Sequence, residues 1–256
     1  MLNKEELERY NRQIILKDFG EKAQENLINS SALIVGLGGL GSVSSLYLVA
    51  AGVGKIGLID KDIVSLSNLQ RQTLFREDEV GKTKVDIAKQ TLERLNSGCK
   101  ISTYNTFLNW DNAKEIMSSY DIIIDATDNF KARYLINDVA IYLNKPFVYG
   151  AIQEDCLQVG VFNEDSSSAT YRDLFPEEEK LIGKENPSKA VMGVLPSIAA
   201  SLQANEAIKL LALKKSGLKN RLLSMNINTY DFSILNILPK KENREKSIKT
   251  FFQNYN

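Results

Sequence analysis

The chain has 256 residues, of which 43% are hydrophobic and 25% are charged, so it is long enough for one large domain with a full core. Its 32 basic and 32 acidic residues cancel, and composition therefore gives no argument for a nucleic-acid or membrane partner. No apolar run is long enough to cross a bilayer, and the amino-terminal MLNKEELERYNRQ lacks the apolar core of a signal peptide, so we expect a cytoplasmic enzyme.

The sequence contains no histidine and only two cysteines. Without imidazole there is no histidine general base, no Ser-His or Cys-His nucleophile and no histidine metal site. Two cysteines are too few for a disulfide framework, and we expect Cys156 to be a packed small residue and Cys99 an exposed loop thiol. Any chemistry must come from carboxylates, cations, backbone dipoles or a bound metal.

Residues 4–29 carry apolar side chains at helical spacing and predict one or two amphipathic helices, with Arg9 and Arg12 on the first. Residues 31–62 then predict a strand, a glycine turn, a helix and a second strand. An apolar run enters GLGGLG at 36–41, continues as a small-residue helix to Gly52 and returns as an apolar run that ends at Asp60.

This unit predicts a nucleotide site. Its glycines permit a sharp turn, a close approach of backbone to phosphate, and tight packing of helix on strand; they are Gly36, Gly38, Gly39 and Gly41. The helix N-terminus attracts an anion. Asp60, 19 residues beyond Gly41, stands where an acid usually binds ribose hydroxyls. The motif alone does not choose between NAD, FAD and ATP.

The following residues continue to alternate. The pattern predicts a polar loop or short helix over 63–75, helices over 79–96, 111–119 and 131–143, and strands over 100–106, 120–125 and 146–151. Such alternation predicts an α/β fold with a doubly wound, mainly parallel sheet and a Rossmann-like nucleotide site.

After residue 151 the pattern changes. Residues 157–162 predict a strand, 163–189 a long polar segment, 194–214 a long helix, and 221–238 two antiparallel strands that extend the sheet. The remaining residues, 240–256, read as a charged tail. Because the chain has no internal repeat and no low-complexity linker, we expect one continuous domain over 1–256.

Charged and amide side chains gather at and beside the predicted strand ends; they are Asp60, Asp62, Asn68, Arg71, Gln72, Lys84, Asp125 and Asp128. A helix N-terminus can accommodate the pyrophosphate of a dinucleotide, whereas a triphosphate with magnesium needs further cations and a carboxylate. Arg71, Lys84 and Asp128 fit the second demand better, so ATP is preferred over NAD. Taken singly, Lys84 could be a solvated helix residue, Asn68 and Arg71 loop caps, and Asp128 a helix N-cap.

Seven segments resemble the ThiF/MoeB/HesA family, bacterial relatives of the ubiquitin-activating enzymes, in their order and spacing. They are RYNRQ at 9–13, GLGGLG at 36–41, Asp60, SNLQRQ at 67–72, GKTK at 81–84, DATDN at 125–129 and SLQANEA at 201–207, within roughly residues 8–214. The resemblance implies an ATP-dependent adenylyltransferase. Its substrate would be the C-terminal glycine carboxylate of a ubiquitin-fold sulfur-carrier protein for molybdopterin or thiamine synthesis, and pyrophosphate would be released.

The resemblance also implies roles for single residues. The turn at 36–41 would lie under the nucleotide, Asp60 would bind the ribose, and Asp128 would hold Mg²⁺. Asn68, Arg71 and Lys84 would hold the phosphates, and we place Asp62 and Gln72 in the same nucleotide-binding set. Arg12 resembles the family's arginine that reaches the ATP phosphates from the second subunit of a homodimer. Residues 30–151 would form the nucleotide-binding half and 152–239 the carrier-binding half, with a crossing loop over 163–190.

The chain departs from the family at the crossing loop. Many members bind a structural zinc through two Cys-x-x-Cys pairs, but here the first pair's place reads TYRD at 170–173 and no cysteine follows Cys156. We therefore expect no zinc site, a crossing loop held in another way or mobile, and adenylation alone, with sulfur delivered by another protein.

Three alternatives stay open. One is activation of a peptide C-terminus in natural-product synthesis. Another is an NAD-dependent oxidoreductase, which would leave Arg12, Arg71 and Lys84 without a role. The last is a binding-only relative that has lost catalysis.

Overall fold

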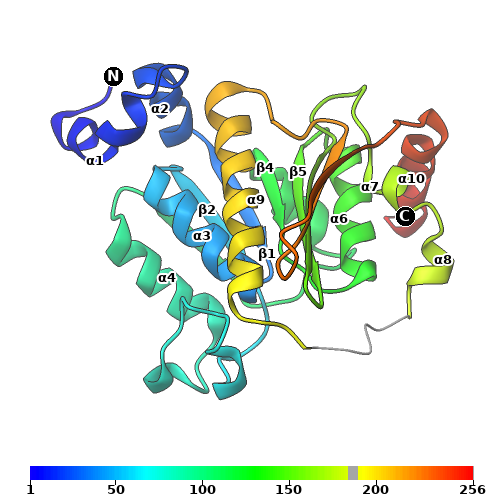
Figure 1. Ribbon diagram of the computed structural model, residues 1–256, viewed down its shortest axis with the longest axis horizontal. Coiled ribbons are helices and arrows are strands. Elements are labelled where there is room, and N and C mark those ends of the chain that lie inside the picture. The colour runs from blue at the N-terminus through cyan, green and yellow to red at the C-terminus, as the bar shows by residue number, and fades with distance from the viewer. Residues whose placement is uncertain (184–189, 256) are drawn as a thin grey trace.

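The computed structural model describes residues 1–183 and 190–255, and its eight strands form one sheet in the order β3-β2-β1-β4-β5-β6-β7-β8 (Figure 1). The strands are β1 (Ser31–Val35), β2 (Lys55–Ile59), β3 (Lys100–Tyr104), β4 (Ile122–Asp125), β5 (Phe147–Gln153), β6 (Cys156–Phe162), β7 (Arg221–Asn226) and β8 (Phe232–Asn236). The first five strands in this order, β3, β2, β1, β4 and β5, are parallel to one another. Strands β6, β7 and β8 each pair antiparallel with the strand before them. The predicted fold class is confirmed.

Ten α-helices and two short 3₁₀-helices lie in the described ranges. They are α1 (Lys4–Ile14), α2 (Gly20–Ile28), α3 (Gly39–Ala51), η1 (Leu66–Asn68), η2 (Glu77–Glu79), α4 (Lys84–Leu95), α5 (Ala113–Ser118), α6 (Phe130–Tyr142), α7 (Tyr171–Leu174), α8 (Glu178–Leu181), α9 (Val194–Leu213) and α10 (Lys241–Asn254). None of these helices combines the length and the apolar composition that a membrane span requires.

The sheet is buried on both faces because successive side chains of a strand point to opposite sides. In β1, Ala32 and Ile34 join the core under α2, α3, α4 and α9. Leu33 and Val35 face the other way, into the core formed with α5, α6 and the carboxyl-terminal helix. Fully buried parallel strands of this kind are short apolar runs, as the sequence shows.

The sheet reverses its direction of winding between β1 and β4. From β1 the chain moves outward to β2 and β3, then returns to place β4 on the other side of β1. In open α/β sheets, ligands bind outside the carboxyl ends of the strands at such a point. We therefore expect a ligand site beyond the carboxyl ends of β1, β2 and β4, the region that we call the switch-point edge.

Two predicted elements differ from the structure. The predicted helix over 79–96 begins only at Lys84, because Gly81 has a φ of +90° and interrupts the helical path after η2. The predicted charged tail folds as α10 against α6, with Phe251 buried and stacked 3.7 Å from the ring centre of Tyr142. Only Ser247 and Phe251 of this helix are buried, and most of its other residues are charged or polar.

Both expectations for the cysteines were wrong. Cys99 is 5% exposed, because the turn before β3 folds it under the core, whereas Cys156 is exposed at the end of the β5–β6 hairpin.

The crossing segment is held by buried ionic contacts over the part that the structure describes. Arg172 in α7 is fully buried and donates to both carboxylate oxygens of Asp138 in α6, at 2.9 and 2.6 Å, and to Glu178 at 2.6 Å. Asp173 accepts a hydrogen bond from Asn243 of α10. Of the two expectations for this loop, the described part fits a loop held without paired cysteines; residues 184–189 lie outside the described ranges.

Candidate functional site

The glycine turn after β1 is fixed by Asp60. The buried Asp60 carboxylate accepts the backbone N–H of Leu37 at 2.6 Å on one oxygen and that of Asp62 at 2.8 Å on the other. One carboxylate thus joins the end of β2 to the turn. Each Asp60 oxygen keeps one further lone pair that could accept a hydrogen bond from a ribose hydroxyl, the role that the sequence predicted.

The glycines of the turn meet different surroundings. Gly36 has a φ of +92°, and a Cβ on Gly41 would lie 1.8 Å from the carbonyl oxygen of Gly36, so both positions require glycine for the fold itself. A Cβ on Gly38 would come no closer than 4.0 Å to another group, the Gln72 amide. Gly38 therefore presents open backbone at the N-terminus of α3, where amide groups and the helix dipole favour a phosphate.

The segment after η1 covers this turn. A Cβ on Gly39 would lie 3.6 Å from the Arg71 stem and 2.9 Å from Pro196 of α9, which shows how closely the three approach. The Arg71 guanidinium donates to the Ser67 carbonyl at 3.1 Å. Gln72 is buried beside Gly38, and within the described residues its Oε1 has no hydrogen-bond partner.

Asn68 and Lys84 are already engaged. Asn68 accepts the backbone N–H of Ser65 at 3.3 Å, so it caps η1 as the simpler interpretation predicted, while its side-chain amide can still donate. The Lys84 ammonium lies 3.0 Å from the Asp62 carboxylate. Lys84 is buried at the start of α4, so the alternative that it is an ordinary solvated helix residue is wrong.

Asp128 lies exposed just beyond β4, at the same edge of the sheet as Asp60. The N-cap of α6 is Asn129, whose side chain accepts the N–H of Ala132 at 2.9 Å. The alternative that Asp128 is the helix cap is therefore wrong, and its carboxylate is available to a ligand.

The fold brings further polar residues to this edge that the sequence did not assign. Gln203 of α9 is fully buried and donates to the backbone carbonyls of Asp125 at 2.8 Å and Val148 at 3.1 Å. Arg133, one turn into α6, donates to the carbonyl of Thr127 at 3.0 Å. Gln203 belongs to the SLQANEA segment at 201–207, but the two carbonyls that it binds are 78 and 55 residues away in the sequence. A local pattern could therefore not predict these contacts.

Arg12 does not join the others within one chain. Its helix is anchored at the far end of α3, where Gln13 donates to the Ala51 carbonyl at 2.7 Å and the Tyr10 ring packs on Gly52. The glycine turn is at the opposite end of α3, which at 13 residues is about 20 Å long. Figure 1 shows α1 and α2 at the upper left, away from the start of α9.

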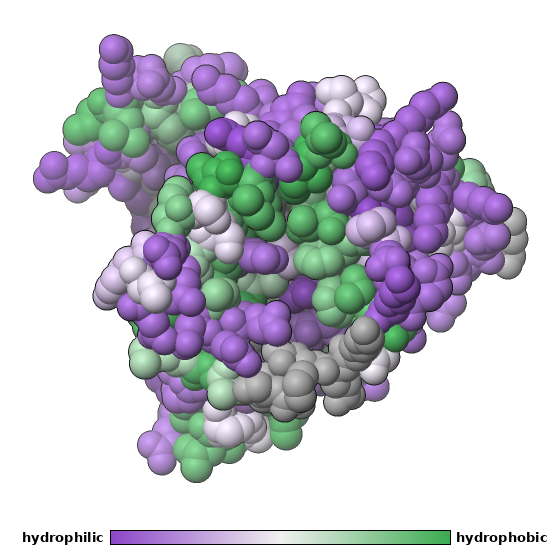
Figure 2. Space-filling view, turned by 45° about the vertical axis from the view of Figure 1, so that its right-hand side comes forward, coloured by the Kyte–Doolittle hydropathy of each residue, from purple (hydrophilic) through white to green (hydrophobic). Residues whose placement is uncertain are grey.

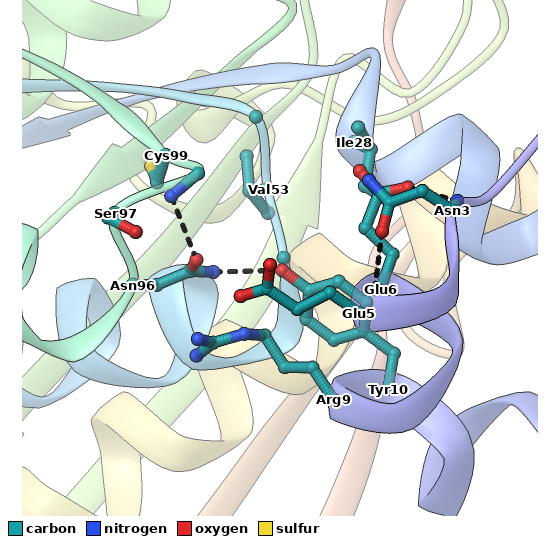
Figure 3. A pocket seen from close by; sticks show the side chains of 13 residues that line it. Asn3, Glu5, Glu6, Arg9, Tyr10, Ile28, Val53, Asn96, Ser97 and Cys99 are labelled. Carbon is teal, nitrogen blue, oxygen red and sulfur yellow. Dashed lines mark hydrogen bonds between the residues drawn. The ribbon is translucent and has the colours of Figure 1, made fainter.

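A small hollow of about 190 Å³ lies at this far end of α3 (Figure 3). Its walls are α1 and the turns after α3 and α4, and the Asn96 amide donates to the Tyr10 hydroxyl at 2.9 Å across it. These contacts fix α1 to the body of the fold. The hollow contains none of the predicted site residues.

The donor set suits magnesium better than a structural metal. Among residues 1–183 and 190–255, no three His, Cys, Asp or Glu side chains gather as ligands. Magnesium, however, is commonly bound by one or two carboxylates together with substrate phosphates and water. Asp128, exposed beside the open turn, fits that arrangement.

Comparison with known proteins gives a consistent result. The model of the ThiF family matches residues 10–247. A "Probable molybdopterin-synthase adenylyltransferase" from Porphyra purpurea is 43% identical over 91% of this chain, which spans 62% of that protein. A "Sulfur carrier protein adenylyltransferase" from Thermus thermophilus is 44% identical over 81% of this chain and is covered over 79% of its own length.

Solved structures share the fold. A crystal structure of PaaA superposes with a TM-score of 0.80 and 28% identity, covering 93% of this chain and 76% of that one. A crystal structure of E. coli MccB with ATP has a TM-score of 0.75 and 25% identity, covering 86% and 66%.

Proposed function

Because the chain belongs to the ThiF family, we propose that it is an ATP-dependent adenylyltransferase that activates the C-terminal glycine carboxylate of a ubiquitin-fold sulfur-carrier protein. The observation that carries the proposal is the switch-point edge of the sheet, where an open glycine turn, a buried lysine and an exposed aspartate lie together. The two curated relatives, named as adenylyltransferases, support the same reaction.

The reaction needs no general base. A carboxylate is ionised at neutral pH, so one of its oxygens can form a bond to the α-phosphorus while the bond from that phosphorus to the bridging oxygen of the β-phosphate breaks. Pyrophosphate leaves, and the carrier ends in an acyl-adenylate. Catalysis then consists of holding two anions in line and stabilising the charge on the phosphoryl oxygens.

The residues of the switch-point edge fit these tasks. The open backbone at Gly38 would receive a phosphate, Asp60 the ribose, and Lys84 with Arg71 the charge of the leaving pyrophosphate. Asn68, with its amide hydrogens, and Gln72, with its unpartnered oxygen, would complete the nucleotide contacts. Mg²⁺, held by Asp128 and phosphate oxygens, would neutralise the triphosphate.

We assign Arg12 to the nucleotide site of a second copy. The position of α1 at the far end of α3 leaves Arg12 out of reach of its own turn. Helix α9 spans the same distance, since Pro196 near its start touches Gly39 and the carbonyl of Ala212 near its end accepts from Asn26 of α2. A two-fold axis across the middle of α9 would exchange these ends and place each Arg12 at the partner's turn.

The outer face of α9 supports this arrangement. Ile198, Leu202 and Ile208 are only partly buried, and the helix has no single polar face turned to solvent. Figure 2 shows apolar residues gathered over the middle of the face that includes α9. A second copy of the chain would cover this surface.

We assign the carrier to the outer edge of the sheet. All five residues of β8 are exposed, and Phe232, Ile234 and Leu235 among them are large and apolar. An unpaired apolar edge strand is a template for strand addition, and a partner that contains a β-sheet can use it. This surface belongs to the predicted carrier-binding half, 152–239.

The test is carrier-dependent exchange of labelled pyrophosphate into ATP, with purified protein, Mg²⁺ and candidate carriers. Exchange with one carrier, from molybdopterin or thiamine synthesis, would assign the pathway. No exchange with any carrier, together with tight NADH binding, would overturn the proposal in favour of the oxidoreductase. Exchange with a peptide instead would support the natural-product alternative.

The shared site has its own test. Arg12→Ala and Asp128→Ala subunits, each inactive alone, should regain up to about a quarter of wild-type exchange when mixed, because random pairing places one intact site in half of the dimers. If mixed dimers are shown to form and stay inactive, Arg12 does not act on the partner's site.

A further inference from the structure

Three buried polar atoms without a hydrogen-bond partner belong to neighbouring residues behind Asp128. They are Asp125 Oδ2, Arg133 Nε and Tyr171 Oη, and in the described part of the chain only Gln72 Oε1 shares this state. Native proteins pair nearly all of their buried polar groups. Three such atoms in one region therefore call for a common explanation.

The three residues form one cluster although they come from β4, α6 and α7. The Arg133 guanidinium lies 5.4 Å from the ring centre of Tyr149, and the Tyr149 and Tyr171 rings are 5.5 Å apart. Burial raises the pKa of Asp125, and the nearby Arg133 opposes that rise. Burial also raises the pKa of Tyr171, and the Arg133 guanidinium, which lies close to the Tyr171 hydroxyl, opposes that rise. Each group thus lies within electrostatic reach of Arg133.

The hydrogen-bonding capacities of the three atoms are complementary to one small polar molecule. Arg133 Nε–H can only donate, Asp125 Oδ2 can accept, and the Tyr171 hydroxyl can do either. A water molecule accepts two hydrogen bonds and donates two, and buried waters typically make about three bonds to groups of this kind.

The same cluster braces the loop that carries Asp128. Asp125 Oδ1 accepts the Thr127 backbone N–H at 3.1 Å and the Thr127 hydroxyl at 2.7 Å. Arg133 Nη2 donates to the Thr127 carbonyl at 3.0 Å. The residue before Asp128 is therefore held on its amide, its side chain and its carbonyl by two buried charged groups.

We propose that Asp125, Arg133 and Tyr171 bind one buried water and act together as positioning residues that set the place of Asp128. Tyr171 brings the crossing segment into this support, because its neighbour Arg172 is fixed to Asp138. The role assigned to Asp128 rests on the proposed function, whereas the water site does not.

A crystal structure of the protein at a resolution of about 1.5 Å tests the water site directly. We expect density for one water within hydrogen-bonding distance of Asp125 Oδ2, Arg133 Nε and Tyr171 Oη. Direct pairing of these atoms with one another, or a dry cluster, would overturn the proposal whatever the protein catalyses.

The positioning role is tested with Tyr171→Phe, which keeps the ring and removes the hydroxyl. Tyr134→Phe is the matched control, since Tyr134 is a buried member of the same aromatic group whose hydroxyl instead donates to the Phe175 carbonyl at 2.7 Å. Mn²⁺ binding to the protein with a non-hydrolysable ATP analogue would be measured by electron paramagnetic resonance. Loss of groups that orient a metal ligand typically costs 10–100-fold in affinity, so we expect about tenfold or more for Tyr171→Phe and under about twofold for the control.

An Asp128→Ala variant separates the two proposals. If Asp128→Ala loses Mn²⁺ affinity while Tyr171→Phe binds Mn²⁺ as the wild type does, Tyr171 is not a positioning residue, and the assignment of Asp128 as the metal ligand stands. If Asp128→Ala also binds normally, the metal role in the proposed function is wrong, and the positioning role falls with it.

Discussion

The Lys84 ammonium lies 3.0 Å from the Asp62 carboxylate, and the two side chains differ sharply in exposure, at 5% for Lys84 and 57% for Asp62. A buried cation needs a partner, and here the partner is a side chain that water reaches. The Lys84 ammonium is thus paired at the switch-point edge with a carboxylate that is accessible to a competing ligand. An entering phosphate can replace Asp62 without uncovering a buried charge.

We predict that Lys84→Met lowers the rate of carrier-dependent pyrophosphate exchange by about 10²-fold or more, the usual effect of removing one group that stabilises transition-state charge. Lys89→Met is the control, because Lys89 lies on the same helix and its pair with Glu93 is exposed on both sides. Equal rates for the two variants would exclude Lys84 from the reaction.

Gly38 and Gly41 should respond in opposite ways to alanine. The Cβ of Gly38→Ala would meet no group closer than 4.0 Å, so the free energy of unfolding should change by less than about 1 kcal/mol. The added methyl would still occupy the space of a bound phosphate. At an overpacking cost of about 1–3 kcal/mol, ATP affinity should fall at least about fivefold.

Gly41→Ala provides the contrast, because its Cβ would lie 1.8 Å from the Gly36 carbonyl oxygen. We expect it to lose stability and nucleotide binding together. Urea unfolding and calorimetric ATP titration measure both quantities, and normal ATP affinity in a folded Gly38→Ala protein would contradict the placement of the nucleotide.

The buried pair of Arg172 and Asp138 should be the most sensitive ionic contact in the crossing segment. Asp138→Asn preserves shape but leaves the Arg172 charge without its partner, and breaking a fully buried pair costs about 3–5 kcal/mol. Lys241→Ala, which removes an exposed pair with Glu245, should not measurably change the urea midpoint. A small effect of Asp138→Asn would mean that Glu178 alone neutralises Arg172.

The two thiols should differ in reactivity in the folded protein. Burial raises the pKa of the Cys99 thiol to about 12, so only about 10⁻⁴ of it is thiolate at pH 8. A thiol reagent should therefore label one site rapidly, Cys156, and a second only after unfolding. Fast labelling of folded Cys156→Ser protein would show that Cys99 is accessible.

The parallel half of the fold could be predicted because its information is local. Apolar runs that end in acids, separated by helical periods, predict the strands and helices of residues 31–151 in order. The glycine turn with Asp60 at its expected distance likewise predicts a nucleotide site at this edge of the sheet, and that site stays a prediction. The assignments of Asp128 and Arg12 remain predictions that the mixed-subunit and metal-binding experiments address.

What the sequence could not predict depends on contacts between distant residues. Arg172 and Asp138 are 34 residues apart, and neither would be chosen as buried from its own neighbours. Helix α10 was missed because charged side chains dominate its composition and hide the single stripe that includes Phe251. The burial of Lys84 could not be predicted from its neighbours in the sequence, because it depends on contact with Asp62, which lies 22 residues earlier.

The carboxylate of Asp60, with one backbone amide on each oxygen, has a consequence for recognition. A nucleotide bound at this turn would meet a backbone that these two hydrogen bonds already hold in place. Little chain freedom is then left to lose on association, so a large part of the contact energy can appear as affinity.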